Sequence, residues 1–350
     1  MGALNHNAWV VGEKDIYNIK EFVEQQGVPL QKWEISINYG IKTGYNEAFI
    51  ISGAVKDRLI LEDPKSKDLI KPILRGKDIS AWHPDFEDLW LIATFPSLNL
   101  NISDYKAIEN YLTSFLPQLK QTGEEFTNSE GKIQKTRKKT FNKWFETQDQ
   151  ISYWRDFEKP KIIYRDITQT FDFCYVEKEM YTNNTVYIIT GTKLKYLTCI
   201  FNSKLFNYCF KNNFTDLGGE ARRLFSVFFE KIPIKHITET EEIPFAKMLD
   251  YLVALKKLNS KESTDQFMFL FFEQIANALV FEFYFKSIFE QHNLHFAKYI
   301  KQLPNLEIDE PLLQLRKIFV LINNQYPSIK QDLFSVLSIP QIAIVMNNNL

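Results

Sequence analysis

The hydrophobic pattern changes its period near residue 240, and this change limits the folds that the chain can adopt. Before that point, apolar residues alternate with polar ones or form short runs between turns, a pattern typical of β-strands. Stretches of this kind cover residues 33–39, 70–74, 90–95 and 161–164. After it, apolar residues recur at helical spacing over most of the remaining chain. The sequence therefore predicts an α+β protein, with a mixed-sheet domain followed by an all-helical C-terminal region.

The same change of pattern sets the expected domain limits. We expect an N-terminal linker at residues 1–29, a sheet-containing domain at 30–237 and a helical domain at 238–350. Within the sheet-containing domain, the spacing of apolar residues also predicts two helices, at residues 104–119 and 195–212.

The stretch from Phe267 to Phe289 is the most apolar in the chain. Glu273, Glu282 and Lys286 interrupt it, and these charges argue against a membrane span. A helix that is apolar on nearly all sides is either buried between neighbours or covers a partner. One hypothesis is therefore a protein-interaction or oligomerisation module, whose helical tail docks a catalytic subunit or a second copy in a homodimer.

The overall charge excludes a generally basic nucleic-acid-binding protein. Lys and Arg number 42 against 43 Asp and Glu, so the net charge is −1 and any surface for a polyanion must be local. The three cysteines show no zinc-ligand spacing, and their odd, small number favours a reducing, cytoplasmic setting. No basic segment followed by an apolar core opens the chain, so we expect no signal peptide.

One local basic surface is predicted between Gly131 and Phe145, a segment that contains six cations and no acidic residue. Such cations repel one another unless phosphates neutralise them. A solvated surface loop is the alternative interpretation. The cations are Lys132, Lys135, Arg137, Lys138, Lys139 and Lys143.

A second candidate is the segment Leu217–Arg223. Its paired glycines, Gly218 and Gly219, allow a ligand to approach the backbone closely. Arg222 and Arg223 can each present a planar fork of donors to phosphates or to the edge of a guanine. A turn and helix cap with ordinary surface arginines would give the same pattern.

Most catalytic signatures are absent from the sequence, including the Walker A, Gly-x-Ser-x-Gly and His-Glu-x-x-His motifs. A Mg-dependent nuclease is an alternative, because Asp85, Asp104 and Lys106 match a loose Pro-Asp…Asp-x-Lys pattern. That chemistry needs the second Asp and the Lys on one face of a strand. Here these two residues open a predicted helix, where positions i and i+2 face apart, so we expect no nuclease site.

Six short motifs follow one another along the first two thirds of the chain. They are GIKTGYNEAFI at 40–50, PILRGKDI at 72–79, KWFE at 143–146, KPKII at 159–163, YLTCIFNSKL at 196–205 and IPI at 232–234. In this order they resemble the TaqI-like C-terminal specificity domain of adenine-N6 DNA methyltransferases and type IIG restriction–modification enzymes. The resemblance covers residues 30–236.

The resemblance implies a module that recognises a specific sequence in double-stranded DNA for a bacterial restriction–modification system. In the family, S-adenosylmethionine and an Asn-Pro-Pro-Tyr motif belong to a separate catalytic domain, and Mg²⁺ belongs to a nuclease. Neither that motif nor a glycine-rich cofactor loop occurs here. We therefore expect no catalytic residue, cofactor or metal in this chain, which would position a methyltransferase or endonuclease from an upstream domain or a separate subunit.

Sequence recognition needs cations for phosphates and polar side chains for base edges. The alternative interpretation of the matched motifs is scaffold, with Gly40, Gly44 and Gly76 as turn formers. Besides the basic segment and the two arginines, we nevertheless expect contacts from two turns within these motifs. These further predicted DNA-binding residues are Lys42, Thr43, Tyr45 and Asn46 on the first turn, and Arg75 and Lys77 on the second.

Overall fold

The structure is a computed structural model that describes residues 13–307 and 309–347. It divides into two compact units that do not follow the order of the chain. The sheet unit contains residues 36–166 and 173–194, and the helical unit contains the other described residues. The mixed sheets, and the helices that follow from residue 239 onward, confirm the predicted α+β class.

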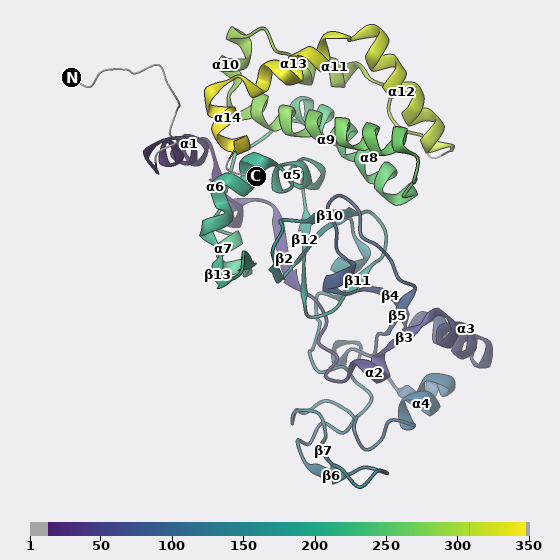
Figure 1. The fold of residues 1–350 in the computed structure, drawn as a ribbon. Helices are drawn as coiled ribbons and strands as arrows, with labels where there is room; N and C mark the ends of the chain where they lie inside the picture. Colours follow the sequence, from purple (N-terminus) through teal and green to yellow (C-terminus); the bar gives the residue numbers. More distant parts are fainter. Residues whose placement is uncertain (1–12, 308, 348–350) are drawn as a thin grey trace. The chain divides into compact units, whose positions relative to one another are not determined.

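The sheet unit contains two four-stranded sheets and a separate hairpin (Figure 1). The strand orders are β10–β8–β12–β2 and β11–β4–β5–β3, and β6 pairs with β7. Strand β11 is parallel to β4, whereas β5 is antiparallel to it, so the second sheet is mixed. The strands are β2 (Ile35–Tyr39), β3 (Ile50–Ser52), β4 (Ile70–Leu74), β5 (Leu89–Ile92), β6 (Glu125–Thr127), β7 (Ile133–Lys135), β8 (Lys161–Arg165), β10 (Phe173–Val176), β11 (Tyr181–Thr182) and β12 (Val186–Gly191).

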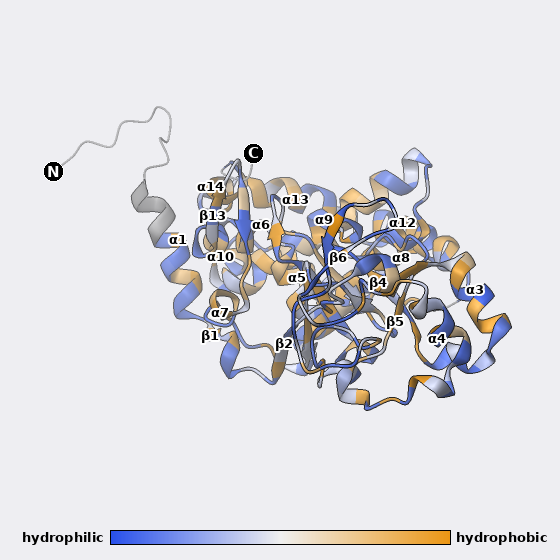
Figure 2. Ribbon diagram, turned by 90° about the horizontal axis from the view of Figure 1, so that it is seen from below, coloured by the Kyte–Doolittle hydropathy of each residue, from blue (hydrophilic) through white to orange (hydrophobic). Residues whose placement is uncertain are grey.

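Three helices belong to the sheet unit, namely α2 (Asn46–Phe49), α3 (Gly53–Glu62) and α4 (Lys106–Thr113). Figure 2 shows both hydrophilic and hydrophobic residues along α3, which buries Gly53 and Leu59 and leaves Leu61 exposed. Helix α4 is the core of the helix predicted at 104–119, and it buries Ile108 and Leu112. It ends before Pro117, which lacks the amide hydrogen that a longer helix would need.

The helical unit contains α1 (Glu13–Gln25) and the helices of the second half of the chain. The segment predicted as a linker therefore contains a helix, and its Ile19 and Val23 are buried. The remaining helices are α5 (Leu194–Phe201), α6 (Lys204–Phe210), α7 (Ser226–Phe229), α8 (Glu239–Leu258), α9 (Ser263–Tyr284), α10 (Lys286–Gln291), α11 (Phe296–Gln302), α12 (Pro311–Gln325), α13 (Ser328–Leu337) and α14 (Pro340–Asn347).

Short strands join distant parts of the helical unit. Strand β1 (Val28–Pro29) pairs with β15 (Pro233–Ile234), so the closing Ile-Pro-Ile motif lies beside the N-terminal segment. Strands β13 (Thr215–Gly218) and β14 (Ala221–Arg223) form a hairpin, and β9 (Ile167–Thr168) adds a third strand to it. This small sheet holds the paired glycines and both arginines singled out in the sequence.

Polar side chains determine where two of the helices begin. The single helix predicted at 195–212 is divided into α5 and α6, because the Ser203 hydroxyl accepts a hydrogen bond from the Phe206 amide at 3.1 Å and caps the second helix. Thr238 and Glu241 form a reciprocal capping box at the start of α8. The acidic stretch after Thr238 is therefore the first turn of a helix, where negative charge is stabilising.

Helix α9 is long and apolar enough, by length and composition, to cross a membrane. The charges counted between 267 and 289 are divided between two helices, since Lys286 begins α10. In the structure, 56% of the most apolar stretch of α9 is buried inside the protein, as in the core helix of a globular domain. The length and composition of α9 are therefore weak evidence for a membrane span.

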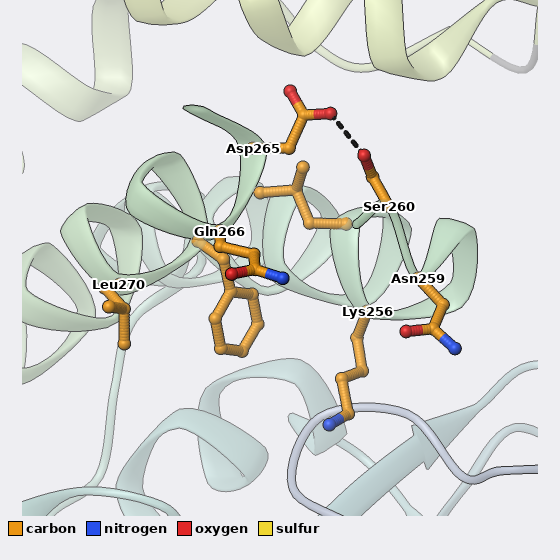
Figure 3. A pocket seen from close by; sticks show the side chains of 8 residues that line it. Lys256, Asn259, Ser260, Asp265, Gln266 and Leu270 are labelled. Carbon is orange, nitrogen blue, oxygen red and sulfur yellow. Dashed lines mark hydrogen bonds between the residues drawn. The ribbon is translucent and has the colours of Figure 1, made fainter. Parts of the chain in front are cut away.

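An ion pair with a buried carboxylate connects the start of α9 to α12. The Asp265 carboxylate accepts hydrogen bonds from Nε and Nη2 of Arg316, both at 2.8 Å, and from the Ser260 hydroxyl at 2.6 Å. Figure 3 shows Asp265 turned toward Ser260 and away from Lys256 and Gln266. Hydrogen bonding by Arg316 lowers the pKa of Asp265 below its usual value.

We expect Asp265→Ala to lower the free energy of unfolding by about 2–3 kcal/mol, because Ser260 loses its acceptor and Arg316 keeps only its exposed pair with Glu262. Urea unfolding at neutral pH measures this loss, with the exposed Glu290→Ala as the control. The lowered pKa predicts that this contribution is present above the usual pKa of aspartate and is lost as the pH falls through the folded-state value. An equal loss in both variants would contradict a specific role for the pair.

Candidate nucleic-acid interface

The first two family motifs meet at the turn that follows β11. The Ile41 amide donates to the Thr182 carbonyl at 2.7 Å, and the Asn183 amide donates to the Leu74 carbonyl at 2.9 Å. A side chain at Gly40 would place its Cβ 1.9 Å from the Asn183 carbonyl oxygen. Glycine is therefore required there by close packing of backbone, and this part of the motif builds the scaffold.

The first predicted DNA-binding turn holds its own shape through side-chain hydrogen bonds. The buried Thr43 hydroxyl donates to Asn46 Oδ1 at 2.6 Å and accepts from the Tyr45 amide at 3.2 Å. Gly44 has a φ of +80°, which favours glycine. Tyr45 packs edge-on against Phe115 with ring centroids 6.3 Å apart. Thr43 and Asn46 thus stabilise the turn.

The second predicted turn is an ion-pair network. Asp78 is buried and accepts from Arg75 Nε at 3.0 Å and from Nη2 at 2.9 Å. Glu87 pairs with the same guanidinium, and with Lys77 Nζ at 3.1 Å. Hydrogen bonds from Lys77 and then Arg75 lower the pKa of Glu87, so it stays charged at neutral pH. The positive charge of this turn is therefore largely compensated within the protein.

Arg137 is buried, unlike the other cations of the basic segment. It is 4% exposed, and its guanidinium makes five hydrogen bonds to backbone carbonyls. Nη1 donates to Thr43 at 2.9 Å and to Glu146 at 2.7 Å, whereas Nη2 donates to Trp144 at 2.6 Å. Nε and Nη2 both donate to the Leu119 carbonyl, at 3.0 and 2.7 Å.

The Arg137 side chain connects three loops that are distant in the sequence. Its bonds connect the first turn to the chain around Leu119 and to the KWFE motif. Burial lowers its pKa to about 10, so it remains charged at neutral pH. A guanidinium whose N–H groups all donate to backbone carbonyls has none left to donate to a phosphate. In this structure Arg137 therefore holds the first turn, the chain around Leu119 and the KWFE motif together.

The basic segment also has acidic neighbours that the local sequence does not contain. Lys132 pairs with Glu130 at 2.9 Å and Lys135 with Glu125 at 3.5 Å, both across or beside the β6–β7 hairpin. Lys143 lies 3.9 Å from the Glu146 carboxylate and donates to the Leu100 carbonyl at 3.1 Å. The premise that these cations have no counter-charge is therefore wrong, because the fold brings carboxylates to them from outside residues 131–145.

Lys42, Lys138 and Lys139 differ from the other predicted cations, and we call them the lysine surface. All three are exposed and make no ion pair or side-chain hydrogen bond with any residue in the described part of the chain. Lys42 and Lys138 both act electrostatically on Asp149, whose pKa is raised by burial and lowered again by these two lysines. Lys42 and Lys138 therefore both lie near the Asp149 carboxylate, although they are far apart in the sequence.

Asp149 was not predicted from the sequence, and its position is explained by backbone contacts. The Gln148 amide donates to the Lys42 carbonyl at 3.1 Å, which places the segment after the KWFE motif beside the first turn. No local sequence pattern indicates that Asp149 lies near Lys42, since only the fold brings the two segments together.

Arg222 and Arg223 belong to the helical unit and differ from each other. Arg222 is 9% exposed, and its Nη1 lies 2.9 Å from the carboxylate of Asp216 on the paired strand. Arg223 is half-buried, with its guanidinium 4.3 Å from the centre of the Phe225 ring. Gly218 and Gly219, with φ of +84° and +55°, form the exposed tip of the hairpin between β13 and β14, where an added Cβ would meet nothing within 4 Å.

The residues of the nuclease alternative do not form a strand site. Asp104 ends the 3₁₀ helix Ile102–Asp104 and Lys106 begins α4, so the two residues flank a junction between helices and neither lies on a strand. Lys106 pairs with Glu109 at 2.8 Å. Within residues 13–307 and 309–347, no group of three or more His, Cys, Asp or Glu side chains is placed to hold a metal ion.

Comparison with known families identifies one domain. Residues 71–234 match the model of the TaqI-like C-terminal specificity domain, which confirms the resemblance over these residues. Five of the six motifs lie in this range, and the GIKTGYNEAFI segment precedes it. No curated protein matches the chain.

Two solved structures are similar at low identity. One is the type IIL restriction–modification enzyme MmeI in complex with DNA, at 13% identity and a TM-score of 0.45, over 83% of this chain and 36% of that one. Another is the type IIG restriction endonuclease BpuSI, at 13% identity and a TM-score of 0.44, over 77% of this chain and 33% of that one. The present chain thus spans about a third of the length of each.

Proposed function

We propose that this chain recognises a specific sequence in duplex DNA as the target-recognition part of a restriction–modification enzyme. The match of residues 71–234 to the TaqI-like specificity domain carries this proposal. The lysine surface supports it, because three exposed lysines without ion-pair partners among the described residues suit phosphate contacts. Phosphate contacts of this kind orient a protein on DNA and leave base recognition to other side chains.

The resemblance extends the proposal to the parent enzyme. In it, this chain would position an adenine-N6 methyltransferase, an endonuclease or both, encoded upstream or on a partner subunit in the cytoplasm. S-adenosylmethionine, and Mg²⁺ for cleavage, would bind to that catalytic part. The described residues of this chain do not fit either group, because they form no metal-ligand cluster and contain no glycine-rich cofactor loop.

A second candidate function is protein interaction through the helical tail, with a catalytic subunit or a second copy as partner. Its support is a set of large apolar side chains that α9, α12 and α13 leave exposed. They are Phe267 and Leu270, each 55% exposed, Val320 at 54% and Phe334 at 76%. Exposed apolar area of this kind is typical of interfaces. Association through it should depend little on salt, whereas DNA binding should weaken steeply.

The experiment for the proposed function has two steps. Immobilised protein first selects duplexes from a random library, and the affinity for the enriched and the random duplexes is then measured at about 50 to 200 mM salt. We expect an enriched sequence and an affinity for both duplexes that falls with salt. Failure to enrich any sequence would contradict target recognition, and binding that is insensitive to salt would contradict a phosphate interface.

Lys42→Ala with Lys138→Ala should weaken binding to all duplexes alike, because flexible lysines act as mobile point charges that suit phosphates. The slope of log K against log salt should fall by about 0.9 for each phosphate contact that the variant removes. The control is Lys65→Ala with Lys67→Ala, two exposed lysines elsewhere in the sheet unit, and should leave the slope unchanged. A loss of sequence preference in the first variant would show that these lysines read bases.

We also expect no methyl transfer to DNA and no cleavage by this chain alone when S-adenosylmethionine and Mg²⁺ are both supplied. The reason is the missing Asn-Pro-Pro-Tyr motif and the placement of Asp104 and Lys106 at the junction of two helices, where they share no strand face. Methyl incorporation and duplex cleavage assays with the purified chain test this. Cleavage that Asp104→Ala abolishes would instead establish the nuclease alternative.

A further inference from the structure

A cavity of about 300 Å³ lies within the helical unit, between α8, α9, α10 and α11. Its buried wall is apolar and consists of Pro244 and Phe245 from α8 and Leu279 from α9, with the half-buried Phe283 beside them. None of the predicted DNA-binding residues lines it. A concave apolar wall with a few polar groups at its mouth is typical of small-molecule sites.

Several polar groups of the cavity already have partners in the protein. Glu241 belongs to the capping box of α8. Glu282 Oε2 accepts a hydrogen bond from the Ala297 amide at 2.8 Å, at the start of α11. Lys235 Nζ donates to Gln26 Oε1 at 2.9 Å and to the Phe283 carbonyl at 2.6 Å. The three charged side chains are held by the fold and have little capacity left for a ligand.

Three other lysines at the mouth are available. Lys286, at the start of α10, and Lys298 and Lys301, on α11, are exposed. Their ammonium groups make no hydrogen bond or ion pair with the residues that the structure describes, and the Lys301 carbonyl accepts from Lys247 Nζ at 2.8 Å. Lys286 does act electrostatically on Glu241 and Glu282, yet burial raises the pKa of Glu282 to about 7, which reduces its negative charge near neutral pH. The unmatched charge at the mouth is therefore positive.

We propose that this cavity binds a small organic anion, with a carboxylate or phosphate attached to a flat apolar body. The body would lie against Phe245, Leu279 and Phe283, where it leaves water, and the anionic group would contact the lysines at the mouth. Neither part alone suffices, since a free anion gains nothing from the apolar wall and an uncharged body leaves the lysines unmatched. The site is separate from DNA recognition and does not depend on it.

The test uses 1-naphthyl phosphate as the probe, with 1-naphthol as the uncharged body and inorganic phosphate as the isolated anion. The probe is titrated into the full chain and the heat of binding is measured by calorimetry. We expect saturable binding of the probe at one site per chain. The two fragments should each bind at least about tenfold more weakly. Absence of saturable probe binding, or equal binding of inorganic phosphate, would overturn the proposal.

Variants then locate the site. Lys286→Gln with Lys301→Gln removes two cations from the mouth, and Ala297→Leu fills the cavity from its half-buried edge. Each variant should lower the affinity for 1-naphthyl phosphate by at least about tenfold. The matched control is Lys317→Gln with Lys330→Gln, on exposed positions of α12 and α13, and should leave binding unchanged. An equal loss in the control, or full affinity in the lysine pair variant, would show that the probe binds elsewhere.

Discussion

Replacing Arg137 by Ala should lower the free energy of unfolding by about 3–4 kcal/mol, the largest stability effect expected from any single cation of the basic segment. The change removes the guanidinium donors of the Thr43, Leu119 and Trp144 carbonyls and leaves the Glu146 carbonyl with Gln121 Nε2 alone. It also removes a guanidinium that lies 5.2 Å from the centre of the Phe49 ring. Urea unfolding of the full chain, followed by tryptophan fluorescence, measures the loss.

Two further variants separate a structural role from a phosphate contact. Arg137→Lys keeps the charge, yet one ammonium cannot reach carbonyls from three loops, so we expect it to lose more than half of the stability that Ala loses. Lys138→Ala, at the exposed neighbouring position, should change stability by less than about 0.5 kcal/mol. If Arg137→Ala is as stable as the unmodified protein but binds DNA poorly, Arg137 is a phosphate contact after all.

The strands could be predicted because their pattern is local. Alternation and short apolar runs predict the position of β4 at Ile70–Leu74 and most of β8. The break between α5 and α6 was missed, because the apolar period continues across Ser203 while its hydroxyl starts a new helix. The Asn202-Ser203 pair is a local signal for a helix N-cap, but helical periodicity alone does not detect a cap.

The grouping of elements into units depends on contacts that no local pattern contains. Residues 195–237 pack in the helical unit, where the Tyr196 ring lies 5.2 Å from that of Phe245 and 5.7 Å from that of Phe283. Helix α1 belongs to the same unit. The domain limits at residues 30 and 238 stay a prediction about which fragments fold alone, and they differ from this division.

The candidate site shows the same limit of sequence reasoning. Counting charges treats Arg137 and Lys138 alike, although the fold buries one and exposes the other. Which of them is buried depends on carbonyls contributed by residues up to 94 positions away. The paired carboxylates Glu125 and Glu130, and the electrostatically coupled Asp149, likewise lie outside the basic segment, so its net charge overstates the charge available to DNA.

The hairpin of β13 and β14, which carries Arg222 and Arg223, should contribute to DNA binding differently from the lysine surface. Lysines suit phosphates, whereas the arginine fork can bond two acceptors on one guanine. Arg223 is the half-buried member of the pair. Because Arg222 is paired with Asp216, we expect it to act by holding the hairpin in shape. These roles extend the proposed function and need separate variants.

Arg223→Ala should cost about 1–3 kcal/mol on the preferred duplex and less on random DNA. Arg222→Ala should likewise lose more affinity for the preferred duplex than for random DNA. Asp216→Asn should give the same pattern of loss, because each change breaks the cross-strand pair that shapes the hairpin. The measurement is the ratio of affinities for preferred and random duplexes at one salt concentration. If Asp216→Asn keeps full preference while Arg222→Ala loses it, Arg222 itself contacts DNA; if all three keep it, sequence is read elsewhere.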